Sequence, residues 1–214
     1  MINDKYRFMF MHVPKVAGSS IEDVLRNVPD TDDISLMKQL EREGTLARKL
    51  AENLDYYFFM FVRNPWDRIV SVYRHSMRMP WRERRRFPKL SFIEYLTALR
   101  DFYVDEIDDG RLSRFDKRHA RKQTIFVPNY EERYFNTKLK GEAKNVFIGR
   151  FERLNEDFEY ITKWIGLGEL ELPHVDWGSG ASVDYREWYD DNTMEMVGEL
   201  YKSDIEHFGY EFGE

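Results

Sequence analysis

Apolar residues along this chain gather into strand-length runs that alternate with helical stripes. Residues 6–12 form a short apolar run that Pro14 stops, and residues 56–62 form a continuous one. A continuous apolar run is typical of a parallel strand that is covered on both faces. Residues 124–127 and 145–148 are shorter strand candidates in a second half that is otherwise richer in polar residues.

Helical spacing or helix-start signals mark the segments between these runs. We expect one helix from a cap at Ser19 or Ser20 to about Asn27 and another from Pro65 to about Met77. Further helices are expected over 34–53, over 91–100, over 156–165 after an Asn155 cap, and over 190–208. Residues 101–141 read mainly as loop. The alternation predicts an α/β fold, a three-layer sandwich with a central parallel sheet, built as a single domain over residues 1–214. In such folds ligands bind at the carboxyl ends of the strands.

Composition narrows the class of protein. The net charge is −6, which argues against indiscriminate nucleic-acid binding, and there is no cysteine to form disulfides or thiolate metal sites. No segment resembles a signal peptide or a membrane span, so we expect a cytoplasmic protein, and nothing indicates its oligomeric state. Two basic runs, 82–86 and 111–122, are either solvated helix faces or a means of attracting an anionic ligand.

The first candidate site follows the first apolar run, where residues 9–21 read MFMHVPKVAGSSI. A strand that leads directly into a helix N-terminus presents free backbone N–H groups, and small residues let an anion approach them. The segment Val16, Ala17, Gly18, Ser19, Ser20 fits this description, and Lys15 adds a positive charge. The order differs from the nucleotide-triphosphate loop, in which the lysine follows the glycines. An ordinary capped turn is the alternative.

The second candidate site follows the second apolar run, where residues 58–75 read FFMFVRNPWDRIVSVYRH. Arg63 lies just beyond a buried strand, where its guanidinium needs an anion or a carboxylate, and Asp67 or Asp55 is the protein alternative. Ser71 shares the helix side of Asp67 by i, i+4 spacing. A second phosphate bound by Arg63 and Ser71 would explain both residues.

These two segments resemble a known family. PKVAGSS resembles the 5′-phosphosulfate loop of sulfotransferases that use 3′-phosphoadenylyl sulfate (PAPS), and FVRNPWDRIVSVYRH resembles their 3′-phosphate segment. The similarity is greatest to the carbohydrate-sulfotransferase branch, sulfotransferase family 2. It extends to FIGRFERLNEDF at 147–158 and to the segment 190–210.

The resemblance implies the P-loop-like sulfotransferase fold and a role for each segment. Lys15 and residues 16–20 would hold the 5′-phosphosulfate, and Arg63 and Ser71 the 3′-phosphate. The reaction would be in-line transfer of a sulfuryl group from PAPS to an acceptor hydroxyl, with PAP (adenosine 3′,5′-bisphosphate) as the leaving group. The acceptor would be a glycan or a glycan-like small molecule. If the two basic runs bind the acceptor, we expect it to be anionic.

The general base is left open between two residues. Many relatives have a histidine in an H-A-T-x-x-x-x-x-L pattern between the phosphate segments, whereas this chain has EGTLARKL, with Glu43 in that place. His119, within the second basic run, is the rival, because an imidazole titrates near neutral pH. We expect His12 and His75 to have supporting roles rather than to act as the base. No group of histidines and carboxylates has metal-ligand spacing, so no metal is expected.

Two other classes of function stay open. A nucleotide-binding or glycan-binding protein that kept the pocket but lost turnover is one, and Glu43 is the feature that favours it. A small-molecule kinase is the other, and the position of Lys15 argues against it.

Overall fold

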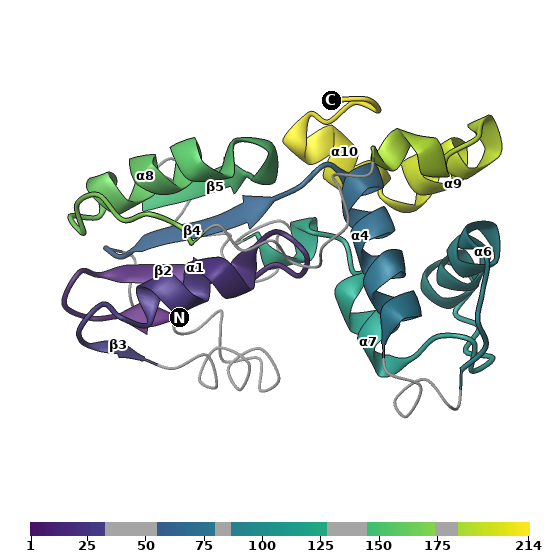
Figure 1. The fold of residues 1–214 in the computed structure, drawn as a ribbon, viewed down its shortest axis with the longest axis horizontal. Coiled ribbons are helices and arrows are strands. Elements are labelled where there is room, and N and C mark those ends of the chain that lie inside the picture. The colour runs from purple at the N-terminus through teal and green to yellow at the C-terminus, as the bar shows by residue number, and fades with distance from the viewer. Residues whose placement is uncertain (33–54, 80–86, 128–144, 174–183) are drawn as a thin grey trace. The chain divides into compact units, whose positions relative to one another are not determined.

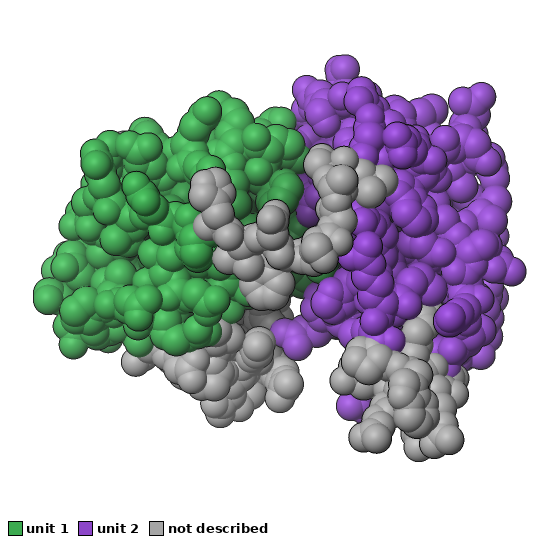
Figure 2. Space-filling model, in the orientation of Figure 1, with its two compact units in different colours: residues 1–62, 125–177 green, residues 63–124, 178–214 purple. Residues whose placement is uncertain are grey.

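The computed structural model describes residues 1–32, 55–79, 87–127, 145–173 and 184–214. The chain divides into two compact units, which Figure 2 colours green and purple. Unit 1 comprises 1–62 and 125–177, and unit 2 comprises 63–124 and 178–214. The expected helix over 34–53 and the first basic run, 82–86, lie outside the described residues.

Unit 1 contains a five-stranded sheet in the order β3-β1-β2-β4-β5 (Figure 1). The strands are β1 (Ile2–Asn3), β2 (Phe8–Met11), β3 (Thr31–Asp32), β4 (Tyr57–Val62) and β5 (Val146–Arg150). β2, β4 and β5 are parallel, as predicted, and their register pairs Met11 with Met60 and Val62 with Arg150. β1 and β3 pair antiparallel beside them and were not predicted. The carboxyl ends of β2 and β4 therefore lie at one edge of the sheet.

Two helices complete the described part of unit 1: α1 (Gly18–Leu25), which follows β2, and α8 (Leu154–Trp164), which packs against β5. A single-turn 3-10 helix, η3 (Phe151–Arg153), connects β5 to α8. All four residues of β2 are buried, as are five of the six in β4. Both faces of these strands are thus covered, which is why their apolar runs are continuous.

Unit 2 is helical. It contains α4 (Pro65–Arg78), α6 (Phe92–Tyr103), α7 (Arg114–His119), η4 (Tyr185–Trp188), α9 (Asp191–Leu200) and α10 (Lys202–Phe208). Its core is rich in aromatic rings: Tyr73 of α4 contacts Phe92, Tyr95 and Trp188 edge-on or tilted. Capping boxes at Ser91, Ser113 and Asp190 begin α6, α7 and α9.

Four predictions differ from the structure. The strand expected at 124–127 is a 3-10 turn, η1 (Thr124–Phe126), and α7 lies within the stretch read as loop. The terminal helix is broken at Tyr201 into α9 and α10. Asn155 lies inside α8 rather than at its cap, which is Arg153. Within the described ranges, every helix is too short or too polar to span a membrane.

Candidate functional site

The turn after β2 has an unusual backbone. Lys15 and Ala17 have positive φ angles of 68° and 63°, a region that L-residues other than asparagine and aspartate rarely adopt. Val13 and Val16 are fully buried and anchor the turn in unit 1. Strained backbone of this kind persists only where the surroundings hold it, and it clusters at functional sites.

This turn delivers the N-terminus of α1. The Ala17 carbonyl accepts hydrogen bonds from the Ser20 and Ile21 N–H groups, at 3.0 and 3.2 Å. The Gly18 and Ser19 N–H groups belong to the first turn of α1, where no earlier carbonyl of the helix is in position to accept from them. Ser19 is exposed, Ser20 is buried and Lys15 is partly exposed. The N-cap is Ala17, not Ser19 or Ser20 as predicted, and it makes no side-chain cap bond.

His12 and Glu22 lie beneath this turn. His12 Nδ1 and Glu22 Oε1 are 2.8 Å apart, and the Glu22 side chain is only 7% exposed. The other edge of the imidazole lies against Gly18, where an added Cβ would come within 2.4 Å of His12 Cδ2. Gly18 therefore has to be small to admit His12, a reason that the sequence did not indicate.

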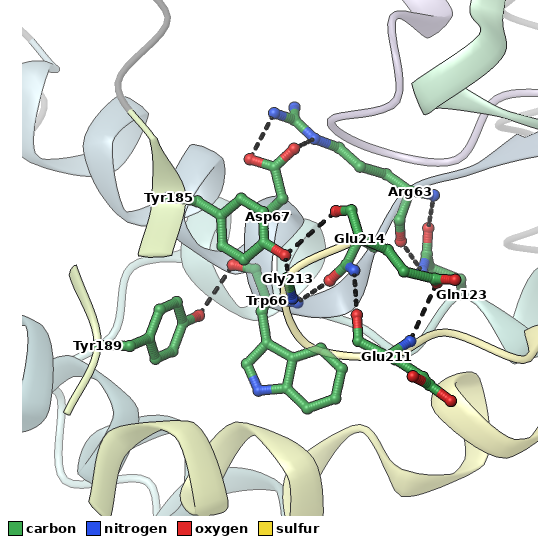
Figure 3. A network of polar contacts seen from close by, with 10 residues as sticks. Arg63, Trp66, Asp67, Gln123, Tyr185, Tyr189, Glu211, Gly213 and Glu214 are labelled. Atoms are coloured by element: carbon green, nitrogen blue, oxygen red, sulfur yellow. Dashed lines mark hydrogen bonds and ion pairs between the residues drawn. The ribbon is translucent and has the colours of Figure 1, made fainter. Parts of the chain in front are cut away.

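Arg63 begins unit 2, directly after β4. Its Nε and Nη2 donate to the two carboxylate oxygens of Asp67, at 2.7 and 2.8 Å (Figure 3). Of the two carboxylates expected as alternatives, Asp67 is the one bound, while Asp55 pairs with Arg7. The bidentate geometry fixes the plane of the guanidinium.

Gln123 holds the backbone of Arg63. The Gln123 amide accepts from the Arg63 N–H and donates to the Arg63 carbonyl, each at 2.9 Å. Gln123 is itself held by the buried carboxylate of Asp204, which accepts from the Gln123 N–H at 2.7 Å and from the N–H and hydroxyl of Thr124. A chain of buried contacts thus runs from α10 to Arg63. Sequence reasoning missed Gln123 and Asp204; the only signal was a polar Asp204 between core positions of an apolar helical pattern.

The start of α4 is fixed by further contacts in unit 2. Asn64 caps the helix by accepting from the Trp66 N–H at 3.1 Å, and its amide donates to the Glu211 carbonyl at 2.8 Å. Tyr189 donates to the Trp66 carbonyl at 2.8 Å (Figure 3). Burial raises the pKa of the Tyr189 hydroxyl, so it stays protonated and a donor. These bonds leave the first turn of α4 little freedom.

Ser71 lies one turn beyond Asp67 on α4 and is partly exposed, as Asp67 is. The structure records no hydrogen bond of the Ser71 side chain within the described residues. One turn further along α4, His75 stacks on Phe115, with ring centroids 4.8 Å apart. Ser71 and Asp67 therefore share an accessible stripe of α4, as the i, i+4 spacing predicted.

His119 ends α7 and is partly exposed. Its Nδ1 lies 2.9 Å from the Phe115 carbonyl, which can only accept, so Nδ1 carries a proton and Nε2 is the basic nitrogen of the neutral ring. Its ring also stacks on Phe115, with centroids 3.8 Å apart. His119 and His75 therefore both stack on the ring of Phe115.

Three successive carbonyls fix the end of α7. The buried guanidinium of Arg68 donates to the His119 and Arg121 carbonyls, at 3.0 and 2.5 Å, and Tyr201 donates to the Ala120 carbonyl at 2.6 Å. Burial raises the pKa of Tyr201 and keeps it a donor. Cationic donors suit the carbonyl end of a helix. The backbone that carries His119 and leads to Gln123 is therefore rigidly held.

The remaining candidates are less informative. Glu43 lies outside the described residues. In the second basic run, Arg111 pairs with Asp101 and Asp109, and Lys117 pairs with Asp108, so part of its charge is neutralised. Within the described ranges no three histidine or carboxylate side chains are grouped as metal ligands; the absence of a metal stays a prediction.

Comparison with known proteins gives these features a context. The profile of the sulfotransferase family matches residues 1–211. The chain is 26% identical over 213 residues to carbohydrate sulfotransferase 14 of Danio rerio, covering 92% of this chain and 54% of that protein. It is 30% identical over 189 residues to carbohydrate sulfotransferase 14 of Mus musculus, covering 82% and 47%.

Carbohydrate sulfotransferase 12 of Xenopus laevis is 22% identical over 252 residues, covering 98% of this chain and 59% of that protein. The chain spans about half the length of the curated relatives it matches. No solved structure gave a significant match. Because the family profile matches nearly the whole chain, and both motifs that suggested the family lie within that match, this protein belongs to the sulfotransferase family.

Proposed function

We propose that this protein is a PAPS-dependent sulfotransferase that transfers a sulfuryl group to an acceptor hydroxyl. The observation that carries the proposal is the strained, lysine-bearing turn that leads from a buried parallel strand into the N-terminus of α1. Membership of the family supports PAPS as the donor and the three-layer, P-loop-like form of the α/β fold. Each half of the donor site is supported by contacts within its own unit.

The turn at 13–20 suits the 5′-phosphosulfate. The Gly18 and Ser19 N–H groups and the Ser19 hydroxyl are donors at the positive end of the α1 dipole. Residues 15–17 alternate in the sign of φ, which turns successive N–H groups toward a common centre, a concavity that binds anions. The donor set therefore fits a phosphosulfate, with Ser20 and the backbone of Val16 and Ala17 completing the loop.

Lys15 has the catalytic role in this proposal. PAPS supplies an activated sulfuryl group whose transfer leaves negative charge on PAP. An ammonium placed beside the departing oxygen stabilises that charge more in the transition state than in the ground state, and such differential stabilisation raises the rate. Lys15 is a compact point charge on a flexible stem, and its backbone is fixed by buried neighbours.

Arg63 and Ser71 are the proposed 3′-phosphate ligands. The Arg63 guanidinium is a planar cation suited to phosphate oxygens, and Asp67 holds its plane through Nε and Nη2. Gln123 fixes the backbone from which the side chain extends. Ser71 adds a hydroxyl from the accessible stripe of α4. This arrangement is rigid before any ligand binds, which lowers the entropy lost on binding.

The acceptor is proposed to be a hydroxyl of a glycan or glycan-like molecule, because the relatives named above are carbohydrate sulfotransferases. A general base is needed to take its proton. His119 is one proposal, since its Nδ1 bond to Phe115 leaves Nε2 as the accepting nitrogen. Glu43 is the other. The second basic run, 111–122, would favour an anionic acceptor.

The test is release of PAP from PAPS in the presence of glycan acceptors. The wild type should release PAP only when an acceptor is present. His119→Gln should lower kcat at least a hundredfold if His119 is the base, the usual scale for general-base catalysis of about 10²–10⁴. His75→Gln is the matched control, because His75 also stacks on Phe115.

The outcomes separate the hypotheses. A large loss of kcat in Glu43→Gln, with His119→Gln active, would assign the base to Glu43. PAP binding by the wild type without turnover of any acceptor would favour the binding protein that has lost catalysis. Turnover of ATP in place of PAPS would favour a kinase and contradict the proposal.

A further inference from the structure

Glu22 is a buried carboxylate close to the proposed anion-binding turn, which is an unfavourable place for a negative charge. It lies in the second turn of α1 and is 7% exposed, in a helix whose N-terminus we propose to bind an anion. Burying a carboxylate is unfavourable unless it is paired and hydrogen-bonded, and a negative charge near an anion site weakens binding. A residue that only filled space here would be apolar.

The partner of Glu22 is His12, and the imidazole connects it to the turn. Nδ1 and Oε1 are 2.8 Å apart, and the edge of the ring formed by Cδ2 and Nε2 lies against Gly18. The His12 side chain is 31% exposed, so the ring reaches from a buried carboxylate to the surface of the turn. A carboxylate that accepts from one imidazole nitrogen fixes both the tautomer and the orientation of the ring.

Gly18 is where this contact acts on the proposed site. It is the first residue of α1, and its N–H is one of the two that the helix leaves without an acceptor. The residue before it, Ala17, has a left-handed backbone that tends to relax unless neighbouring contacts hold it. A ring packed on Gly18 opposes that relaxation.

We propose that His12 and Glu22 form a positioning pair for the 5′-phosphosulfate loop, an inference that rests on the proposed function. Glu22 orients the imidazole through Nδ1, the imidazole holds Gly18, and Gly18 fixes the direction of the first N–H groups of α1. His12 acts through the loop rather than on the reacting atoms, so neither residue is assigned a catalytic role. The pair is specific to the 5′ half of the donor site.

The test measures binding of PAP and of adenosine 3′-monophosphate, which lacks the 5′ group, by calorimetry. Glu22→Ala should weaken PAP binding about tenfold or more, because the ring loses its orientation. Glu22→Gln should stay within about threefold of the wild type, since its amide oxygen accepts the same bond from Nδ1. Adenosine 3′-monophosphate should bind all variants alike.

Asp23→Ala is the matched control, because Asp23 is the next residue of α1 and is exposed. It should leave PAP binding unchanged. If Glu22→Ala does not fold, His12→Gln replaces it: this variant keeps a donor but removes the ring from Gly18, and it should also weaken PAP binding about tenfold.

Three results would contradict the positioning role. The first is unchanged PAP binding in Glu22→Ala, or in His12→Gln if that variant replaces it. The others are equal losses of affinity for PAP and adenosine 3′-monophosphate, or PAP binding in Glu22→Gln as weak as in Glu22→Ala. A wild type that binds no PAP would instead overturn the proposed function. The two failures are therefore distinguishable.

Discussion

Lys15 and Ala17 show how single residues shape the turn after β2. Both hold positive φ angles, at a cost of roughly 1–2 kcal/mol each for residues with a Cβ. Gly18, the one glycine of the motif, is not among the residues with positive φ. Its small size serves the imidazole of His12, which lies where a Cβ would be.

Substitutions at Ala17 and at Gly18 should therefore have unequal effects on folding stability. Gly18→Ala should destabilise the fold by about 1–3 kcal/mol, the usual range for overpacking, because ring and helix must separate. Ala17→Gly should stay within about 1 kcal/mol of the wild type, since relief of the left-handed strain offsets the greater entropy of the unfolded glycine. Urea unfolding of both variants measures the difference. Equal stability of Gly18→Ala and the wild type would show that His12 does not pack as described.

The residues of the candidate site were predictable to different degrees. Arg63 and its partner Asp67 are four residues apart on one helix start, so local spacing was enough to predict them. Gln123 contacts Arg63 across 60 residues, and Asp204 contacts Gln123 across 81. No local pattern encodes such contacts. For His12, the pairing with Glu22 depends on how β2 meets α1, which only the fold establishes.

At the scale of elements, local signals located the starts of α4 and α6, but they misplaced the caps of α1 and α8 and missed the break between α9 and α10. Asn64 and Pro65 begin α4 and Ser91 begins α6, as their capping chemistry predicts. The break between α9 and α10 was missed, because Tyr201 fits the helical pattern but turns its hydroxyl to the Ala120 carbonyl. The strand predicted at 124–127 is a 3-10 turn, and the N–H of its first residue, Thr124, donates to Asp204 instead of to a neighbouring strand.

Asp204 should therefore stabilise unit 2 and support Arg63. Asp204→Asn replaces one acceptor oxygen by an NH₂ group that faces a donor, and it should cost about 1–3 kcal/mol of folding free energy. Glu206→Gln is the control, since it removes the same charge from an exposed position of α10. Thermal unfolding of both variants measures the effect. Equal melting temperatures would contradict the buried chain of contacts from Asp204 to Arg63.

The connection between α6 and α7 should respond to acid. The hydrogen bond from Arg111 holds the pKa of Asp101 below its ordinary value of 3.8. A pKa that is lower in the folded state gives stability above that ordinary value, and the stability is lost as the pH falls through the folded pKa. Asp101→Asn should be less stable than the wild type at neutral pH, and the gap should close as the pH falls below 3.8 and through the lowered pKa of the folded state.

Urea midpoints across this pH range make the measurement, with Asp105→Asn as a control from the exposed end of the same connection. A gap between wild type and Asp101→Asn that persists unchanged at low pH would contradict the ion-pair explanation. The effect should be small in either case, since partly exposed ion pairs contribute little.

At the scale of the whole molecule, the parallel strands β2, β4 and β5 and the two turns that follow the first two of them could be predicted from pattern alone. The short strands β1 and β3 could not, because two-residue strands leave no periodicity. The division into two units likewise has no marker in composition. The family profile nevertheless matches residues 1–211 and so includes residues of both units.

The proposed function requires that the chain bind both phosphate groups of PAP, and calorimetry of PAP binding is the measurement that decides it. The wild type should bind PAP, and Arg63→Ala and Lys15→Ala should each weaken binding at least tenfold, about 1.4 kcal/mol. Arg7→Ala is the control, because Arg7 is an exposed arginine paired with Asp55. No binding of PAP by the wild type, or equal binding by all four proteins, would contradict the account.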